Sequence, residues 1–264
     1  MSLVKGKKRT LKYEVHLVTY LDILGFRDLV AEASPNFISR AIRLILEATE
    51  PDSTSKRNFK ENYVNFSDLI VHTVPVYSRM NQKHRVGLVF DRVHSLFHAQ
   101  SKLIQEGLLI RGALTLGGME RSYGALFGPG LILAYDLERQ EAKFPRIILD
   151  PALLREFETN PILRRHKYPE EMEYLSSFIT EDSDGFTFID YLKGMQTELD
   201  TSEFIEFLEC HKALVEKGLT EFGDKNKSVL AKYEWLQKYH NLAAATYLQP
   251  VVQDRYMVKT PEDE

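Results

Sequence analysis

The sequence predicts an α/β (α+β) protein with a ferredoxin-like βαββαβ core, additional strands and a helical C-terminal extension. Short apolar runs rich in β-branched and aromatic residues alternate with helix-periodic segments, giving the order β-α-β-β-α-β-(β)-α-β up to about residue 150. Two long helix-periodic segments then close the chain. Its 264 residues fit one large domain. We expect a core domain over 1–195 with an extension over 196–264 packed on it, not two independent domains.

The first part of the chain predicts a strand, a broken helix and a hairpin. Residues 15–21 form a short apolar run that is typical of a buried strand. A helix is expected over about 27–48, interrupted near Pro35, where Ser34 can cap the second piece. The apolar stretches within 63–76 flank a polar Ser-Asp pair, which predicts a β-hairpin with a tight turn.

The next segment predicts a helix and a strand separated by glycine. Helical spacing over 86–105 stops at Gly107, and 108–116 follows as a strand. The pair Gly117-Gly118 predicts a turn after that strand. A further strand is possible over 123–127. The remaining expected elements are a helix to about 142, a strand over 145–150, a short helix opened by Pro151, an edge strand over 186–192, and helices over 201–222 and 225–245.

Composition excludes several classes of function. The net charge of -4 argues against nucleic-acid binding through bulk positive charge. The single cysteine, Cys210, excludes an intrachain disulfide and a cysteine-rich zinc site. No apolar run approaches the roughly 20 residues that span a bilayer, and no apolar segment typical of a secretory signal follows the basic start. We therefore expect a cytoplasmic protein that binds neither membrane nor nucleic acid.

Two aspartates occupy positions that can carry chemistry. Asp22 closes the first strand and Asp68 lies in the hairpin turn. In a βαββ unit these two ends of the sheet can meet, and paired carboxylates repel each other unless a cation neutralises them. Mg²⁺ and Mn²⁺ prefer such oxygen ligands together with phosphates, and Gly25 lets backbone amides approach phosphate oxygens. The alternative is that Asp22 is an acid at a helix N-terminus and Asp68 an ordinary turn residue.

Four segments resemble the class III nucleotidyl cyclases. The segment 20–26, Tyr-Leu-Asp-Ile-Leu-Gly-Phe, is similar to their D-I-x-G-F signature. The Phe-Ser-Asp at 66–68 matches the place of their second metal aspartate. The segments 110–117 and 124–134 are similar to their fourth strand and to the following strand and helix start. The order and spacing of the four segments make the resemblance more specific than any one of them.

Within that class, the chain looks most like the pyrimidine cyclases of bacterial antiphage signalling, the Pycsar cyclases. The segments 20–26, 66–68, 134–138 and 144–150 support this resemblance. It implies a homodimer with active sites at the interface, which converts UTP or CTP into cyclic UMP or cyclic CMP. The product would activate a separate effector. UTP is preferred over CTP only because it is the commoner substrate of the family.

The resemblance also implies roles for individual residues. Asp22, Asp68 and the Ile23 carbonyl would hold two Mg²⁺ or Mn²⁺ ions per site. Backbone amides around Ile23 to Phe26, including that of Gly25, would position the β- and γ-phosphates. The expected reaction is in-line attack of the ribose 3′-oxygen on the α-phosphorus, with pyrophosphate leaving.

The chain departs from the purine cyclases at their substrate-reading positions. Their transition-state asparagine falls on Ile132 and their arginine on Asp136, neither of which donates to a phosphate. Ala125 stands where many of them have a base-reading aspartate, and Val64 replaces their base-selecting lysine or glutamate. The adenine or guanine apparatus is therefore missing.

Other residues are candidates for the missing functions. Arg111, supplied across the dimer, is the first candidate for transition-state charge and Arg27 the second; the alternatives are a salt bridge on a strand and a solvated helix residue. Tyr63 is a candidate to fill the space of a second purine ring, with packing on the opposite face of the sheet as its alternative. Val64 has the same strand parity as Asp68, which favours Val64 as the residue that faces the pocket. A bulge in the hairpin could instead turn Tyr63 toward the pocket.

Three other functions stay open. A purine cyclase shares the chemistry but needs another base pocket. A degenerate cyclase-homology module would only bind nucleotide or partners. A polymerase-palm nucleotidyl transferase shares the core and paired aspartates but requires a primer or acceptor. Outside these motifs, His72, His94 and His98 are interpreted as packing or surface residues.

Overall fold

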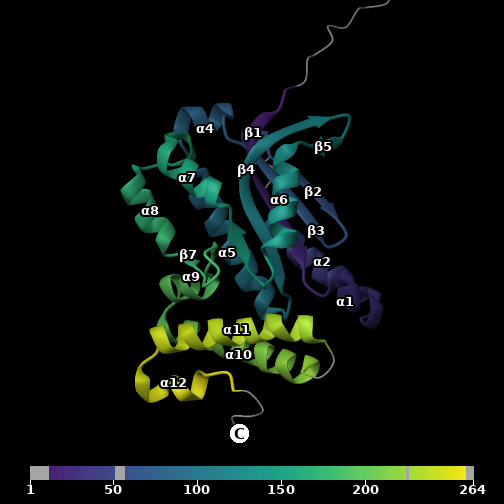
Figure 1. The fold of residues 1–264 in the computed structure, drawn as a ribbon, viewed down its shortest axis with the longest axis vertical. Coiled ribbons are helices and arrows are strands. Elements are labelled where there is room, and N and C mark those ends of the chain that lie inside the picture. Colours follow the sequence, from purple (N-terminus) through teal and green to yellow (C-terminus); the bar gives the residue numbers. More distant parts are fainter. Residues whose placement is uncertain (1–11, 51–56, 224–225, 260–264) are drawn as a thin grey trace, which may run out of the picture.

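A mixed β-sheet runs through the computed structural model, which describes residues 12–50, 57–223 and 226–259. Seven strands follow the order β2-β3-β1-β4-β6-β8-β7, and β5 pairs with the far end of β4 (Figure 1). The strands are β1 Glu14–Ile23, β2 Asn62–Phe66, β3 Leu69–Pro75, β4 Ile110–Ser122, β5 Ala125–Phe127, β6 Ile147–Leu149, β7 Ile179–Glu181 and β8 Thr187–Ile189.

Helices lie on both faces of this sheet and beyond one end of it (Figure 1). They are α1 Phe26–Glu32, α2 Pro35–Thr49, α4 Arg79–His84, α5 Leu88–Gln105, α6 Pro129–Gln140, α7 Pro151–Thr159, η1 Pro161–Leu163, α8 Tyr168–Ser176, α9 Tyr191–Glu198, α10 Thr201–Phe222, α11 Lys227–Tyr247 and α12 Pro250–Tyr256. No helix among the described residues is long and apolar enough to cross a membrane.

The predicted fold class is confirmed. The first four long strands have the order β2-β3-β1-β4, with β1 antiparallel to both neighbours, which is the ferredoxin-like arrangement. The predicted break in the first helical segment is also found. The hydroxyl of Ser34 accepts a hydrogen bond from the Phe37 N–H, and Pro35 opens α2.

Alternation along β1 divides the interior into two layers. Leu17, Leu21 and Ile23 face the large hydrophobic core that also contains buried residues of α2 and α5. Val18 and Tyr20 face a smaller cluster beneath α6. In Figure 1, α6 lies in front of β1 and β4, and it contacts both strands. Asp22 has the parity of Tyr20, so its side chain belongs to the α6 face.

Two sequence-based predictions about β-structure are wrong. Gly117 and Gly118 do not form a turn, because β4 continues through them to Ser122. A Cβ on Gly117 would lie 2.3 Å from the Cα of Gly130 in α6, so the glycine permits close packing between helix and strand. The strand predicted at an edge, β8, lies between β6 and β7, and β7 forms the edge.

The helices after α9 pack on the same hydrophobic core as the sheet, and buried residues such as Phe204 and Leu236 belong to it. The predicted division into 1–195 and 196–264 stays a prediction.

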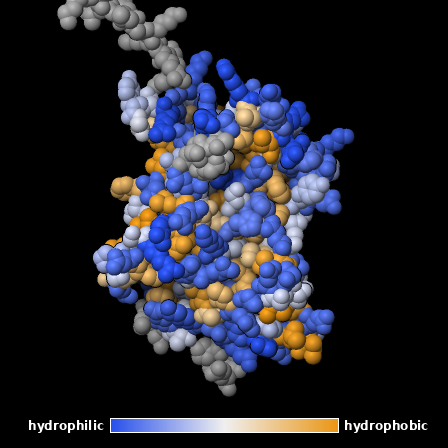
Figure 2. Space-filling model, turned by 180° about the vertical axis from the view of Figure 1, so that it is seen from behind, coloured by the Kyte–Doolittle hydropathy of each residue, from blue (hydrophilic) through white to orange (hydrophobic). Residues whose placement is uncertain are grey.

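Seen from behind, hydrophilic side chains cover most of the surface, with hydrophobic ones scattered among them (Figure 2).

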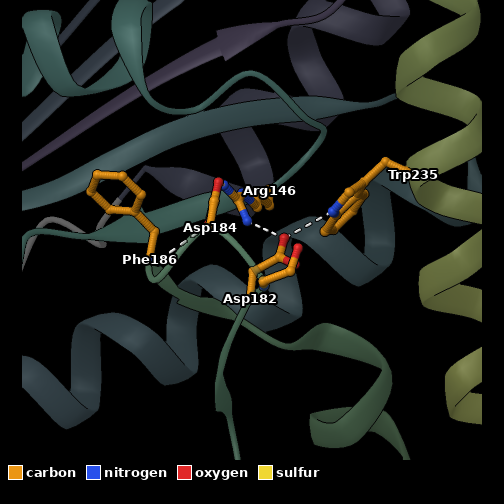
Figure 3. A network of polar contacts seen from close by, with 6 residues as sticks. Arg146, Asp182, Asp184, Phe186 and Trp235 are labelled. Atoms are coloured by element: carbon orange, nitrogen blue, oxygen red, sulfur yellow. Dashed lines mark hydrogen bonds and ion pairs between the residues drawn. The ribbon is translucent and has the colours of Figure 1, made fainter.

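A buried arginine fastens α11 to the sheet. Arg146, just before β6, is fully buried and forms ion pairs with Asp182 and Asp184 near the β7–β8 hairpin. The indole N–H of Trp235 in α11 donates to Asp182 at 2.8 Å (Figure 3). The Arg146 guanidinium also lies 5.8 Å from the centre of the Trp235 ring. The two aspartates and the Trp235 ring therefore compensate the free energy cost of burying the Arg146 charge.

Candidate active site

Asp22 and Asp68 lie on adjacent strands at the same end of the sheet. β1 pairs with β3 up to Leu21 and Ile70, so Asp22 and the β2–β3 turn follow directly. Ser67 takes a positive φ of 60° in this two-residue turn. Burial raises the pKa of Asp22, the Arg111 guanidinium opposes that rise, and the Asp68 carboxylate adds to it through its charge and a side-chain hydrogen bond. The structure thus brings together the two carboxylates that the sequence selected.

Arg111 lies between two carboxylates of its own chain. The β1–β4 register places it opposite Asp22, and its Nε is 3.3 Å from the Asp22 Oδ2. The same Nε lies 2.6 Å from the Oε1 of Glu138 in α6. Burial raises the pKa of Glu138, the Arg111 cation opposes the rise, and Asp22 adds to it. Arg111 therefore supplies positive charge at the site without a partner subunit.

Helix α6 places Glu138 beside Arg111 because the residues that precede Glu138 on its buried side are small. Gly130, Ala134 and Glu138, spaced four apart, are its buried residues. Gly130 packs directly against the Gly117 backbone, so the helix can approach β4 closely. Sequence reasoning missed Glu138, although it ends the segment 134–138 of the Pycsar resemblance. The signal that could have found it is this spacing.

A lysine near the C-terminal end of the chain interacts electrostatically with the site. Lys232, half-buried on α11, has its pKa lowered by burial and by Arg111, while Asp22 and Glu138 raise it. It lines a cavity of 470 Å³ together with Leu24 and Gly25. That volume lies within the roughly 300–1,000 Å³ usual for small-molecule sites. Sequence reasoning missed Lys232, because nothing local marks this lysine among those of the last helices.

The turn after β1 opens toward the same cavity. Gly25 has a φ of 74°, a left-handed conformation that suits glycine, and caps α1. The Leu24 N–H already donates to the Leu109 carbonyl at 2.8 Å, so it is not free for a phosphate. The side chains of Ile23 and Phe26 are buried in the core, so only their backbone groups could contact a ligand. Arg27 is exposed on α1.

The structure places Tyr63 away from Asp22. β2 and β3 pair residue for residue from Asn62 to Phe66, so the hairpin contains no bulge that would turn Tyr63 inward. The Tyr63 hydroxyl shares a 2.8 Å hydrogen bond with the Thr49 hydroxyl of α2, on the face of the larger core. Val64 has the opposite parity, pairs with Val71 and is 38% exposed on the α6 face.

Ile132 and Asp136, which the resemblance was expected to align with an asparagine and an arginine of the purine cyclases, lie on the outer side of α6. Ile132 is 64% exposed and Asp136 is half-buried. Neither belongs to the buried stripe that holds Glu138. Positive charge near the two aspartates comes instead from Arg111 and Lys232.

No protein-family model matches this sequence, and no curated protein matches it. Among solved structures, it is similar to the catalytic core of a rhodopsin-guanylyl cyclase with converted specificity in complex with ATPαS, at 18% identity and a TM-score of 0.43, over 67% of this chain and 94% of that one. It is similar to the guanylate cyclase domain of RhGC from Catenaria anguillulae in complex with GTP, at 14% identity and a TM-score of 0.36, over 68% and 96%. A class III adenylyl cyclase-like ATP-binding protein from Pseudomonas aeruginosa is similar at 16% identity and a TM-score of 0.39, over 62% and 41%. Each similarity covers about two thirds of this chain.

Proposed function

We propose that this chain is a nucleotidyl cyclase that converts a nucleoside triphosphate, UTP by preference, into the 3′,5′-cyclic monophosphate and pyrophosphate. The observation that carries the proposal is the pairing of Asp22 with Asp68 beside two cationic side chains, Arg111 and Lys232. Carboxylates and cations in one partly buried site suit a substrate that brings both divalent metal ions and phosphates.

The donor set fits Mg²⁺ or Mn²⁺. Asp22 and Asp68 are hard oxygen ligands, and their mutual repulsion raises the pKa of Asp22 beyond the effect of burial, which a bound cation would relieve. Asp22, Asp68 and the Ile23 carbonyl would hold two ions. When bound, such ions supply charge stabilisation and a more acidic ribose 3′-hydroxyl.

The remaining groups of the site bind and orient the triphosphate. The cavity that begins at Leu24 and Gly25 would take the β- and γ-phosphates, with the amides of Gly25 and Phe26 as donors. Lys232 lines this cavity and would neutralise phosphate charge. Arg111, oriented by Glu138, would offset the charge that develops at the α-phosphate. These two cations would replace the donors absent at Ile132 and Asp136.

We propose that the nucleotide base is selected by the face of β2 that lies toward α6. Val64 is an apolar residue on the same face as Asp22, where purine cyclases place a charged selector. A small apolar wall favours one ring over two only weakly, by about 1–3 kcal/mol. The preference for UTP over CTP rests on the resemblance to the Pycsar cyclases alone, as does a product that acts on a separate effector in antiphage defence. The cytoplasmic location is proposed from the amino-acid sequence, as above.

The same face carries the proposed dimer interface. Several large apolar side chains on it are exposed: Val64, Phe66, Ile132, Leu133 and Tyr135. Exposed apolar residues gathered on one face are typical of an interaction surface. A homodimer formed there would bring each partner's α6 close to the other's Val64. Light scattering across the concentrations used for activity tests this, and a fully active monomer would contradict it.

One assay separates the proposal from its rivals. The full chain is incubated with UTP, CTP, ATP or GTP and Mn²⁺, pyrophosphate is measured and the product mass is determined. We expect cyclic UMP, lost in Asp22→Asn and Asp68→Asn but retained in Asp254→Asn, an exposed control on α12. A preference for ATP or GTP would instead identify a purine cyclase.

The last helices of the chain provide a second test. Lys232→Met should lower turnover, and Lys238→Met, an exposed lysine on the same helix, should not. Nucleotide binding without any cyclic product would favour the degenerate module, which the residues Ile132 and Asp136 support. Product that forms only with a primer would favour a nucleotidyl transferase.

A further inference from the structure

Two histidines and a glutamate converge on the surface between α5 and α9. The Nε2 of His94 lies 2.6 Å from the Oε1 of Glu198, and the Nε2 of His98 lies 3.1 Å from its Oε2. Ligand atoms of all three side chains lie within 4.8 Å of one another. Among the described residues, this is the one group of three or more His, Cys, Asp or Glu side chains with such a geometry.

The local structure explains the convergence. His94 and His98 are four residues apart on α5, so both project from one face of the helix. The His94 ring packs edge-on against Phe97 and Phe178, each at 5.2 Å between ring centres, which restricts its orientation. Glu198 is the last residue of α9, a helix that packs against α5. Both histidines are partly exposed, and His94 packs on aromatic rings, in line with their interpretation as packing or surface residues. The shared glutamate partner is a feature that the sequence did not indicate.

We propose that His94, His98 and Glu198 bind a borderline transition-metal dication, with Zn²⁺ as the chemical type. Two imidazole nitrogens and one carboxylate form a ligand set that suits Zn²⁺, with a fourth position left for water. That position is accessible, because the side chains of His94 and His98 are 36% and 49% exposed. Imidazole nitrogens are poor ligands for Mg²⁺, so the site differs in selectivity from the carboxylates at Asp22 and Asp68.

The bound ion would link α5 to the end of α9, because both helices would supply its ligands. α5 lies against the sheet, and α9 leads directly into α10 and the rest of the C-terminal helices. Metal binding therefore stabilises the attachment of these helices to the core, by an amount set by the affinity and concentration of the metal. This role uses no residue of the candidate active site and does not depend on the proposed cyclase activity.

The test is a calorimetric titration of the metal-stripped full chain with Zn²⁺, in excess Mg²⁺ to occupy the carboxylate pair. We expect one Zn²⁺ per chain and a rise in melting temperature. His98→Ala and Glu198→Gln should each weaken binding by at least about 100-fold, because the loss of an outer-shell partner alone costs about 10–100-fold. Co²⁺ should give a ligand-field spectrum that both variants lose.

The matched control is His166→Ala. His166 also contacts a glutamate four residues away, Glu170 at 3.4 Å, but no third ligand group joins this pair among the described residues. This variant should bind Zn²⁺ like the wild type. All variants change exposed or half-exposed side chains, and circular dichroism checks their folding. Wild-type Zn²⁺ binding in His98→Ala and Glu198→Gln, or no binding by the parent chain, would overturn the proposal and leave a histidine–glutamate hydrogen-bond cluster.

Discussion

The position of Arg111 between Asp22 and Glu138 makes a quantitative prediction about stability. The Glu138 side chain is only 4% exposed, and the Arg111 Nε is its cationic neighbour at 2.6 Å. With an effective dielectric constant of about 20, this separation corresponds to an attraction of about 6 kcal/mol, which offsets the desolvation of both groups. Arg111→Met keeps the volume and removes the charge, so Glu138 is left buried and unpaired.

We expect Arg111→Met to lower the free energy of unfolding by about 3–5 kcal/mol at neutral pH, as breaking buried ion pairs generally does. Urea denaturation followed by circular dichroism measures this change. The double variant Arg111→Met/Glu138→Gln should recover most of the loss, because Glu138, the more deeply buried partner of Arg111, then carries no charge. The control is Arg40→Met, which breaks an ion pair with Glu106 of similar length, 2.9 Å, at 60% and 36% exposure. Its effect should stay below about 1 kcal/mol.

The loss in Arg111→Met should depend on pH. Burial raises the pKa of Glu138, and removing Arg111 removes the main influence that lowers it. The folded variant then binds more protons than its unfolded chain, so its stability falls as the pH rises. The destabilisation should be greatest at neutral pH and shrink toward the ordinary glutamate range of about 4–5. The reasoning is refuted if Arg111→Met costs no more than Arg40→Met, or if the double variant recovers nothing.

Three other substitutions test the packing and the electrostatics of the sheet. Gly117→Ala should destabilise the chain by about 1–3 kcal/mol in urea denaturation, because the added Cβ would lie 2.3 Å from the Gly130 Cα. Burial lowers the pKa of His16 to about 4, so the unfolded state takes up its proton first as the pH falls, and stability drops. This histidine should account for a loss of about 2 kcal/mol between pH 7 and pH 5, and His16→Gln should show a smaller loss over the same interval. Tyr63→Phe should cost about 1 kcal/mol through its Thr49 partner and leave the relative turnover of UTP and ATP unchanged; a changed substrate preference would contradict its placement on the far face of the sheet.

The sequence determined the elements whose signals are local, together with one consequence of their order. The apolar run before Asp22, the polar turn at Asp68 and the capped break at Ser34 are each legible within a few residues. The βαββαβ order allows few topologies, because crossover connections are right-handed and neighbouring strands tend to pair. That restriction allows Asp22 and Asp68 to meet, and the resemblance to the cyclases favours this pairing over the alternative roles.

Tertiary structure decided which faces meet and which distant residues join them. Gly117 was predicted to form a turn because glycine permits both turns and close packing, and only the position of α6 shows which applies. The face on which Tyr63 lies depends on whether β2 contains a bulge, since a shift of one residue reverses every side chain. Lys232 interacts electrostatically with Asp22 from a helix whose sequence shows only helical spacing. Such contacts depend on how helices pack on the sheet, and no local pattern encodes that packing.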